Sequence, residues 1–192
     1  MLSAVIPSRS WELPAARALA NQFLRMGASE AIIQTGGGGV ARARNLGAKR
    51  AQGDYLLFCD VDGWPSGQLE FDASGDFWVP KVADASGDGY TKMWVAAAGL
   101  GMESGLWHSL PPLVVLPRKV LDAVGGWPED NHLEDLELGF LLHEAGYARR
   151  MLPMTVYIRR AIHPITKVTG NTYRPWVAKA EKAPALVITL PT

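Results

Sequence analysis

Apolar and polar residues alternate over the first 62 residues in segments whose lengths and periods predict three strands and two helices. The strands are expected at residues 2–6, 31–34 and 55–59, and the helices at residues 15–26 and 40–52. Pro7 ends the first strand, and Pro14 suits the first turn of the first helix. The apolar face of that helix consists of Ala16, Leu19, Ala20 and Phe23. This strand-helix alternation predicts an α/β fold whose sheet is largely parallel and has helices on its faces.

The pattern loosens after Asp62, where turn residues dominate from 63 to 75. Short strands are expected at residues 77–82, 92–96, 113–116 and 154–159, and helices at residues 118–124, 133–145 and 174–182. The helix at 133–145 is expected to place Leu133, Leu136, Phe140 and Leu141 on one face. Because neither an internal repeat nor a linker is visible, we expect one compact domain over residues 1–192. It would consist of two halves, residues 1–62 and 63–192.

Composition narrows the class of protein. A chain of 192 residues that is 48% hydrophobic can bury a core of ordinary size. One cysteine excludes internal disulfides and a cysteine-based zinc cluster. No apolar run approaches the roughly 20 residues of a membrane span, and the N-terminus does not have the pattern of a secretory signal. We therefore expect a soluble protein without an integral membrane segment, located in the cytoplasm.

The net charge of zero conceals an asymmetry along the chain. Residues 1–148 carry a balance of −7, and residues 149–192 carry +7. A basic C-terminal segment suits an anionic partner, such as a phosphorylated substrate, a nucleic acid or a lipid surface. It equally suits a solvated surface that balances the acidic part and binds nothing.

Two pairs of acidic residues lie at the ends of predicted elements, one after a strand and one at the start of a helix. Asp60 and Asp62 close the third strand, where ligands of parallel α/β sheets bind, and alternate residues of a strand project to one side. They can therefore bind one Mg2+ or Mn2+ together, or merely form a polar turn. Glu134 and Asp135 begin a helix, where acids are also favoured by the helix dipole. His163 is a candidate metal or phosphate ligand, with a purely structural histidine as the alternative.

A glycine run offers a different function. Residues 36–41 read GGGGVA, which satisfies G-x-G-x-x-A between a strand and a helix. Such a loop lets the backbone approach a pyrophosphate at a helix N-terminus. This spacing leaves open an NAD(P)-binding Rossmann oxidoreductase, although no Tyr-x-x-x-Lys pair accompanies it.

The segment ARARNLGAKRAQGDYLLFCDVD (41–62) resembles the family 2 glycosyltransferases of the GT-A fold. These carry an Ala-Arg-Asn-x-Gly helix, a Gly-Asp turn and a strand that ends in D-x-D. The segment LVVLPRKVLDAVGGWPEDNHLEDLELGFLLHEAGY (113–147) is similar to their acceptor-side block, and SAVIPSR (3–9) to their first strand. The resemblance implies a Rossmann-like, mostly parallel or mixed central sheet flanked by helices.

The resemblance also implies roles for matched positions. Asp62 would bind a divalent metal (Mn2+ or Mg2+), with Asp60 contacting the metal or the nucleotide-diphosphate sugar and His163 as a looser match near the metal. Asp135 would be the catalytic base, with Glu134 beside it. The other matched positions are Pro7, Ser8, Arg9, Arg44 and Asn45 on the donor side and Gly126 and Trp127 on the acceptor side. The family's reaction inverts the anomeric centre. Apart from the resemblance, Arg159, Arg160 and Lys167 of the basic C-terminal segment flank His163 and could assist the leaving diphosphate.

This chain departs from the family at the end of its second strand. The family has an acid there that reads the nucleobase or ribose, whereas this chain reads Gln34-Thr35-Gly36-Gly37. The donor base therefore stays open, and so does a non-catalytic module that binds a nucleotide or sugar without turning it over. The acceptor is equally open: a saccharide, a lipid-linked hydroxyl or a modified nucleic acid would fit. Trp64, Trp107 and Trp127 are candidates for stacking on it.

Overall fold

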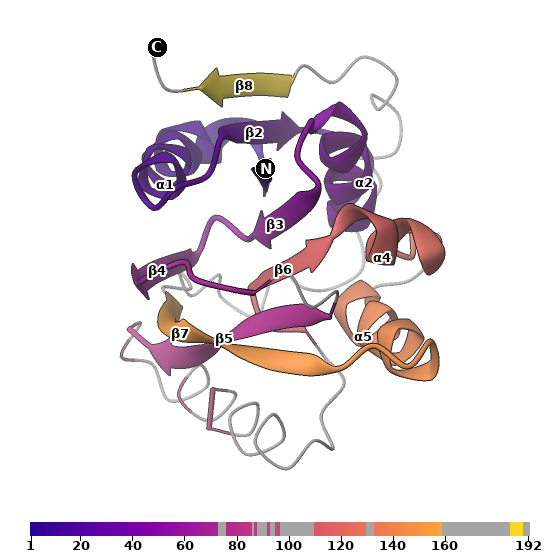
Figure 1. Ribbon diagram of the computed structural model, residues 1–192. Helices are drawn as coiled ribbons and strands as arrows, with labels where there is room; N and C mark the ends of the chain where they lie inside the picture. The colour runs from indigo at the N-terminus through magenta and orange to yellow at the C-terminus, as the bar shows by residue number, and fades with distance from the viewer. Residues whose placement is uncertain are drawn as a thin grey trace, which may run out of the picture.

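The computed structural model describes residues 1–72, 76–85, 87, 92, 95–96, 110–129, 133–158 and 185–189. Within them, one eight-stranded sheet has the order β4-β7-β5-β6-β3-β1-β2-β8 (Figure 1). The strands are β1 (Leu2–Ser8), β2 (Glu30–Thr35), β3 (Tyr55–Cys59), β4 (Gly63–Gly67), β5 (Phe77–Asp84), β6 (Leu113–Pro117), β7 (Arg149–Ile158) and β8 (Ala185–Thr189). The helices are α1 (Leu13–Arg25), α2 (Val40–Arg50), α4 (Arg118–Ala123) and α5 (Glu134–Glu144), with a 3-10 turn η1 at Ser10–Glu12.

The sheet is mixed. β1 lies at the centre of a parallel unit, paired with β2 on one side and β3 on the other. β6 and β8 add to this unit in antiparallel fashion. Pro7 lies inside β1 rather than after it; the ladder to β3 ends at Val5, so Pro7 pairs with a strand on one side only. The missing N–H of proline is tolerated where a strand has a free side.

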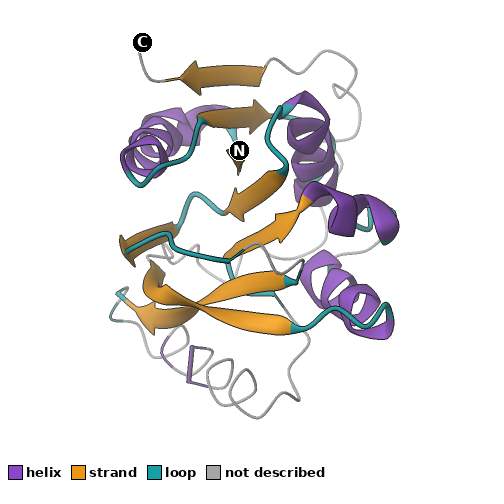
Figure 2. Cartoon of the chain, viewed as in Figure 1, coloured by secondary structure: helices purple, strands orange, loops and turns teal. Residues whose placement is uncertain are grey.

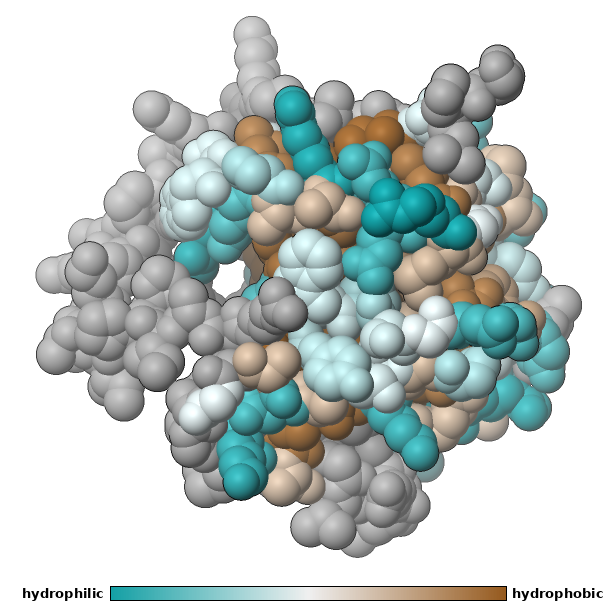
Figure 3. All heavy atoms as spheres, turned by 90° about the vertical axis from the view of Figure 1, so that its left-hand side faces the viewer, coloured by the Kyte–Doolittle hydropathy of each residue, from teal (hydrophilic) through white to brown (hydrophobic). Residues whose placement is uncertain are grey.

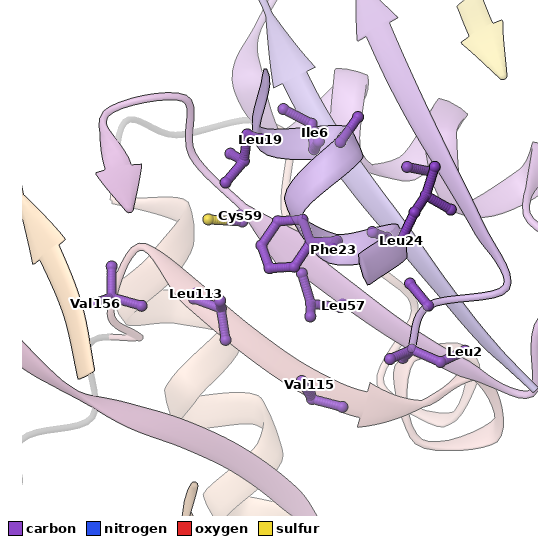
Figure 4. Close-up of a cluster of buried hydrophobic side chains, with 14 of the residues drawn as sticks. Leu2, Ile6, Leu19, Phe23, Leu24, Leu57, Cys59, Leu113, Val115 and Val156 are labelled. Carbon is purple, nitrogen blue, oxygen red and sulfur yellow. The ribbon is translucent and has the colours of Figure 1, made fainter. Parts of the chain in front are cut away.

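Helices cover both faces of the sheet, which makes three layers. Figures 1 and 2 show α1 on one face and α2, α4 and α5 on the other. Because side chains of a strand alternate between faces, β1 to β3 contribute to both hydrophobic cores. Leu19 and Phe23 of α1 pack with Ile6, Leu57 and their neighbours in one core (Figure 4). The other core packs α2, α4 and α5 against the opposite faces of the same strands.

The surface on the α1 side mixes hydrophilic and hydrophobic residues and shows no single continuous apolar area outside the grey atoms (Figure 3). No helix of the described residues is long and apolar enough to span a membrane.

The predicted α/β fold with a mixed sheet is confirmed, and so are the first three strands and two helices to within a few residues. Ala16, Leu19, Ala20 and Phe23 form the buried face of α1 as expected. The second helix ends at Arg50, because Ala51 is already extended.

Three expectations for the second half are wrong. Residues 63–67 form strand β4 rather than a turn; β4 is an edge strand, where Pro65 is tolerated. Lys92, Val95 and Ala96 are helical rather than extended, as an alanine-rich run favours. In α5 the buried side chains are Leu138 and Leu142, whereas Leu133 and Phe140 are exposed. The apolar residues of α5 are distributed around most of the helix, so their spacing does not indicate which face is buried. The helix expected at residues 174–182 lies outside the described residues.

Candidate active site

Asp60 and Asp62 lie directly beyond the carboxyl end of β3, in a tight turn. The turn is closed by the Gly63 N–H, which donates to the Asp60 carbonyl oxygen at 3.0 Å. β3 ends at Cys59, so the alternation of a strand, from which we expected both carboxylates to face one side, does not apply here. The turn instead places both residues at the carboxyl end of β3.

The second acidic pair is brought to the same edge. Glu134 and Asp135 occupy the first turn of α5, as predicted. A short segment joins the two motifs: the Asp60 N–H donates to Pro112 O at 2.9 Å, and the Leu110 N–H donates to Asp135 O at 3.2 Å. Residues far apart in the sequence therefore share one backbone framework.

Arg44 of α2 connects the two acidic pairs directly. Its Nη2 donates to Asp60 Oδ1 at 2.6 Å, and its Nη1 donates to Glu134 Oε1 at 3.0 Å. Only 6% of the Arg44 side chain is exposed, against 33% for Asp60 and 13% for Glu134. Burial by itself lowers the pKa of the guanidinium, but the two carboxylates outweigh it and the pKa is raised above its ordinary value. Arg44 is thus a buried, permanent cation between the acids.

Asn45, the next residue of α2, binds the turn that precedes α5. Its Nδ2 donates to Trp127 O and to Glu129 Oε1, each at 2.8 Å, and its Oδ1 accepts from the Trp127 N–H at 2.8 Å. Gly126 is required beside it: its φ is +89°, and a Cβ there would lie 2.9 Å from Asn45 Oδ1. The Trp127 ring in turn lies under the Arg44 guanidinium, 4.1 Å from its carbon to the ring centroid.

The loop after β1 lies at the same carboxyl edge as the other parallel strands, because Ser8 pairs with Thr35 of β2. Ser8 Oγ donates to Arg9 O at 3.0 Å, and the Arg9 N–H donates to Glu12 Oε2 at 2.8 Å. The Arg9 guanidinium lies 5.2 Å from the ring centroid of Trp11, which is 64% exposed. Pro7 and Ser8 therefore belong to β1 rather than to a loop, and Arg9 follows them at the carboxyl end of the strand. Their role in donor binding stays a prediction.

The glycine run joins β2 to α2 at this edge. Gly36, Gly37 and Gly38 all have positive φ, a conformation that side-chain-bearing residues rarely adopt. At the end of β2, Gln34 is fully buried and its Oε1 accepts from Arg50. The side chain at this strand end is thus a neutral amide that is hydrogen-bonded to Arg50.

Sequence reasoning did not foresee that Arg44 is the partner of both acidic pairs, although a signal was present. Ala41, Arg44 and Ala48 are spaced as one helical face, and all three are buried. A buried arginine requires carboxylate partners. His163, Arg159, Arg160, Lys167 and Trp107 lie outside the described residues, so their predicted roles stay predictions.

The donor set suits a hard divalent cation. Asp60 and Asp62 offer carboxylate oxygens, the preferred ligands of Mg2+ and Mn2+, which commonly take few protein ligands together with substrate phosphates. Burial, followed by the charges of Asp60 and Asp62, raises the pKa of the buried Cys59 thiol well above its ordinary value. The charge of Arg44 acts in the opposite direction, so both acids and their buried cation act on this thiol. Within the described ranges, no three His, Cys, Asp or Glu side chains gather as a preformed metal site.

Comparisons with known proteins agree with this geometry. The family model "Glycosyl transferase family 2" matches residues 16–70, which include α2, β3 and both aspartates of the turn. The mannosyltransferase PcManGT from Pyrobaculum calidifontis, in complex with GDP-Man and Mn2+, has a TM-score of 0.61 at 14% identity over 84% of this chain and 57% of its own. Residues 1–349 of S. aureus TarS, in complex with UDP-GlcNAc, have a TM-score of 0.61 at 15% identity over 84% of this chain and 60% of that structure.

The catalytic domain of Drosophila β1,4-galactosyltransferase 7, in complex with xylobiose, has a TM-score of 0.55 at 15% identity over 79% of this chain and 64% of its own. The comparison with curated proteins gave no match. The chain spans 57–64% of the length of these three structures. The fold is the GT-A fold. The resemblance to the family 2 glycosyltransferases is confirmed.

Proposed function

We propose that this protein is a metal-dependent, inverting glycosyltransferase that moves a sugar from a nucleotide-diphosphate sugar to an acceptor hydroxyl. The observation that carries the proposal is the convergence of Asp60 and Glu134 on one buried guanidinium at the carboxyl edge of the sheet. It joins the D-x-D turn and the Glu-Asp helix start into a single site. The complexes of the P. calidifontis enzyme with GDP-Man and Mn2+ and of TarS with UDP-GlcNAc support the donor class.

The donor would bind across the carboxyl ends of β1, β2 and β3, where ligands of open α/β sheets bind. Pro7, Ser8 and Arg9 would border the nucleoside, and Asp60 and Asp62 would face the diphosphate and hold the metal. A bound divalent cation neutralises the charge that develops on the leaving diphosphate. Without an acid at Gln34, recognition of the base would fall to other groups at this edge.

Asp135 would accept the proton of the acceptor hydroxyl as general base. Its position in the first turn of α5 suits this role, since the helix dipole favours an ionised carboxylate there. Glu134, which already binds Arg44, would hold that turn in place. Attack from the side opposite the leaving group in one displacement inverts the anomeric centre. Gly126 and Trp127 would border the acceptor.

The test is a calorimetric titration with a panel of nucleoside diphosphates, with and without Mn2+. Binding should require Mn2+ and should weaken at least tenfold in Asp62→Asn. Asp122→Asn, at an exposed aspartate of α4, is the matched control and should bind normally. Absence of metal-dependent binding to every nucleotide would contradict the proposal. Binding of NAD(P) without metal would instead support the oxidoreductase alternative.

A transfer assay separates an enzyme from a non-catalytic binding module. Asp135→Asn should lose at least a hundredfold in turnover while it retains donor affinity, because general bases typically contribute 10²–10⁴-fold. If the wild-type protein binds a nucleotide sugar but neither hydrolyses it nor transfers the sugar to any acceptor class, the protein is a non-catalytic binding module. The neutral Gln34 at the end of β2 is the feature that favours this second candidate.

A further inference from the structure

Residues from two regions that are far apart in the sequence meet at the side chain of Arg44. Asp60 follows β3, Glu134 begins α5, and Trp127 lies in the turn between α4 and α5. The two carboxylates bind the two terminal nitrogens of the guanidinium, and the indole ring lies against its face. Each carboxylate has its own nitrogen, so both can be bound at once in the planar fork of an arginine.

Because Arg44 is buried, the guanidinium and the two carboxylates depend on one another. Because its side chain is only 6% exposed, Arg44 has little access to water and depends on its two carboxylates for its hydrogen bonds. Its Nε is buried without a hydrogen-bond partner among the described residues. Removing the cation would in turn leave Asp60 and Glu134 as neighbouring negative charges that repel each other.

We propose that Arg44 is a positioning residue that couples the metal-binding turn to the turn that carries the catalytic base. Displacement of Asp60 releases one arm of the guanidinium and loosens the start of α5, and displacement of Glu134 loosens the turn after β3. The assignment of metal and base to these two turns rests on the proposed function. The coupling between them rests on the contacts of Arg44 alone.

Hydrogen exchange measures the coupling without any substrate. In Asp60→Asn, the Glu137 amide, which donates to Leu133 O at 2.9 Å in the first turn of α5, should exchange at least threefold faster. In Glu134→Gln, the Gly63 amide, which donates to Asp60 O, should do the same. Arg42→Met is the matched control, because Arg42 is a half-exposed arginine of the same helix whose Nε is 4.0 Å from Glu129. It should change neither amide.

The coupling should vanish when the guanidinium is absent. In an Arg44→Met background, Asp60→Asn should produce no further acceleration of exchange at the Glu137 amide. If Arg44→Met does not fold, Arg44→Lys replaces it, because a single ammonium group cannot bind both carboxylates as the guanidinium does. If Asp60→Asn and Glu134→Gln each alter only their own turn in the wild-type background, the proposal is overturned. This result stands whether or not the protein transfers a sugar.

Titration with Mn2+ alone gives a second readout with a distinctive sign. Loss of a positive charge beside Asp60 would by itself strengthen cation binding. If Arg44 positions the turn, Arg44→Met and Arg44→Lys should both weaken Mn2+ binding at least fivefold, and Arg42→Met should not. Tighter binding in Arg44→Met would contradict positioning. If the wild-type protein binds Mn2+ only together with a nucleoside diphosphate, as few protein ligands would favour, the same comparison of variants is made with that nucleotide present and the same outcomes decide.

Discussion

Asn45 and Trp127 exchange two hydrogen bonds, one in each direction, and so join α2 to the turn that precedes α5. The amide nitrogen of the side chain donates to Trp127 O, and the amide oxygen accepts from the Trp127 N–H. Only an amide offers a donor and an acceptor in this arrangement. Asn45 therefore has a structural role, which is to bind the backbone of Trp127, whether or not it also contacts a sugar donor.

Asn45→Asp keeps the shape but replaces the donor with a second acceptor. The carboxylate would face Trp127 O and Glu129 and leave the carbonyl of the buried Trp127 without its donor. We therefore expect a loss of about 1–3 kcal/mol in the free energy of unfolding. Urea denaturation measures this, and Asn45→Ala should cost less because it introduces no like-charge contact. A loss within 0.5 kcal/mol of the wild type, roughly the scatter of surface substitutions, would contradict the prediction.

Gly126 and Gly125 form a matched pair for separating backbone strain from steric contact. Both have positive φ, at +89° and +85°, but a Cβ meets Asn45 Oδ1 at 2.9 Å only at Gly126 and meets nothing within 4 Å at Gly125. Alanine at either position should cost about 1–2 kcal/mol for the left-handed backbone. Gly126→Ala should cost at least about 1 kcal/mol more than Gly125→Ala because of the contact. Equal losses in chemical denaturation would show that the contact is relaxed at no cost.

Gly47 of α2 packs directly on β1. A Cβ at Gly47 would lie 2.4 Å from Val5 Cγ1, and Val5 is fully buried. Gly47→Ala should therefore destabilise the protein by about 1–3 kcal/mol, despite the better helix propensity of alanine. Val5→Ala should remove the clash, so the double variant should be more stable than the sum of the two single effects predicts. Additive effects in a double-mutant cycle would argue against this contact.

Arg118, the first residue of α4, joins this helix to the C-terminus of α2. Its guanidinium donates to Ala48 O at 2.8 Å, to Ala51 O at 2.7 Å and to Gly53 O at 3.0 and 3.1 Å. A cation also complements the negative end of a helix dipole. Arg118→Met should lower the free energy of unfolding by about 2–4 kcal/mol, whereas Lys119→Met, at the exposed neighbouring position, should change it by less than about 0.5 kcal/mol.

The Cys59 thiol should be unreactive in the folded protein. Burial, then the charges of Asp60 and Asp62, raises its pKa, so the nucleophilic thiolate is disfavoured until the chain unfolds. A folded-state pKa above the unfolded one stabilises the protein below the unfolded value, about 8.5, and this contribution is lost as the pH rises beyond it. Thiol titration should report no free thiol before denaturation. The stability of the wild type should fall more steeply above about pH 8.5 than that of Cys59→Ala, by at most about 1.4 kcal/mol per pH unit.

Most of the local elements in the first half, and the residue types of the candidate site, follow from the sequence alone. Clear periodicity predicted β1, α1, β2, α2 and β3, and the two acidic pairs were visible at the ends of apolar elements. Where the pattern of apolar residues is ambiguous, the sequence does not predict the buried face of a helix or the presence of a strand. The apolar circumference of α5 fits more than one buried face, and β4 is stabilised by its neighbour β7 rather than by its own residues.

How these parts combine depends on the packing of the whole chain. Sheet order places β6 beside β3, and this brings the segment at Leu110–Pro112 between Asp60 and Asp135. The placement of α2 on the same face as α5 then directs Arg44 to Asp60 and Glu134 at once. Such a contact depends on the packing of three separate elements, and no local pattern encodes the distance between them. The sequence could show that a buried arginine needed acidic partners; the packing of the helices on the sheet selected which ones.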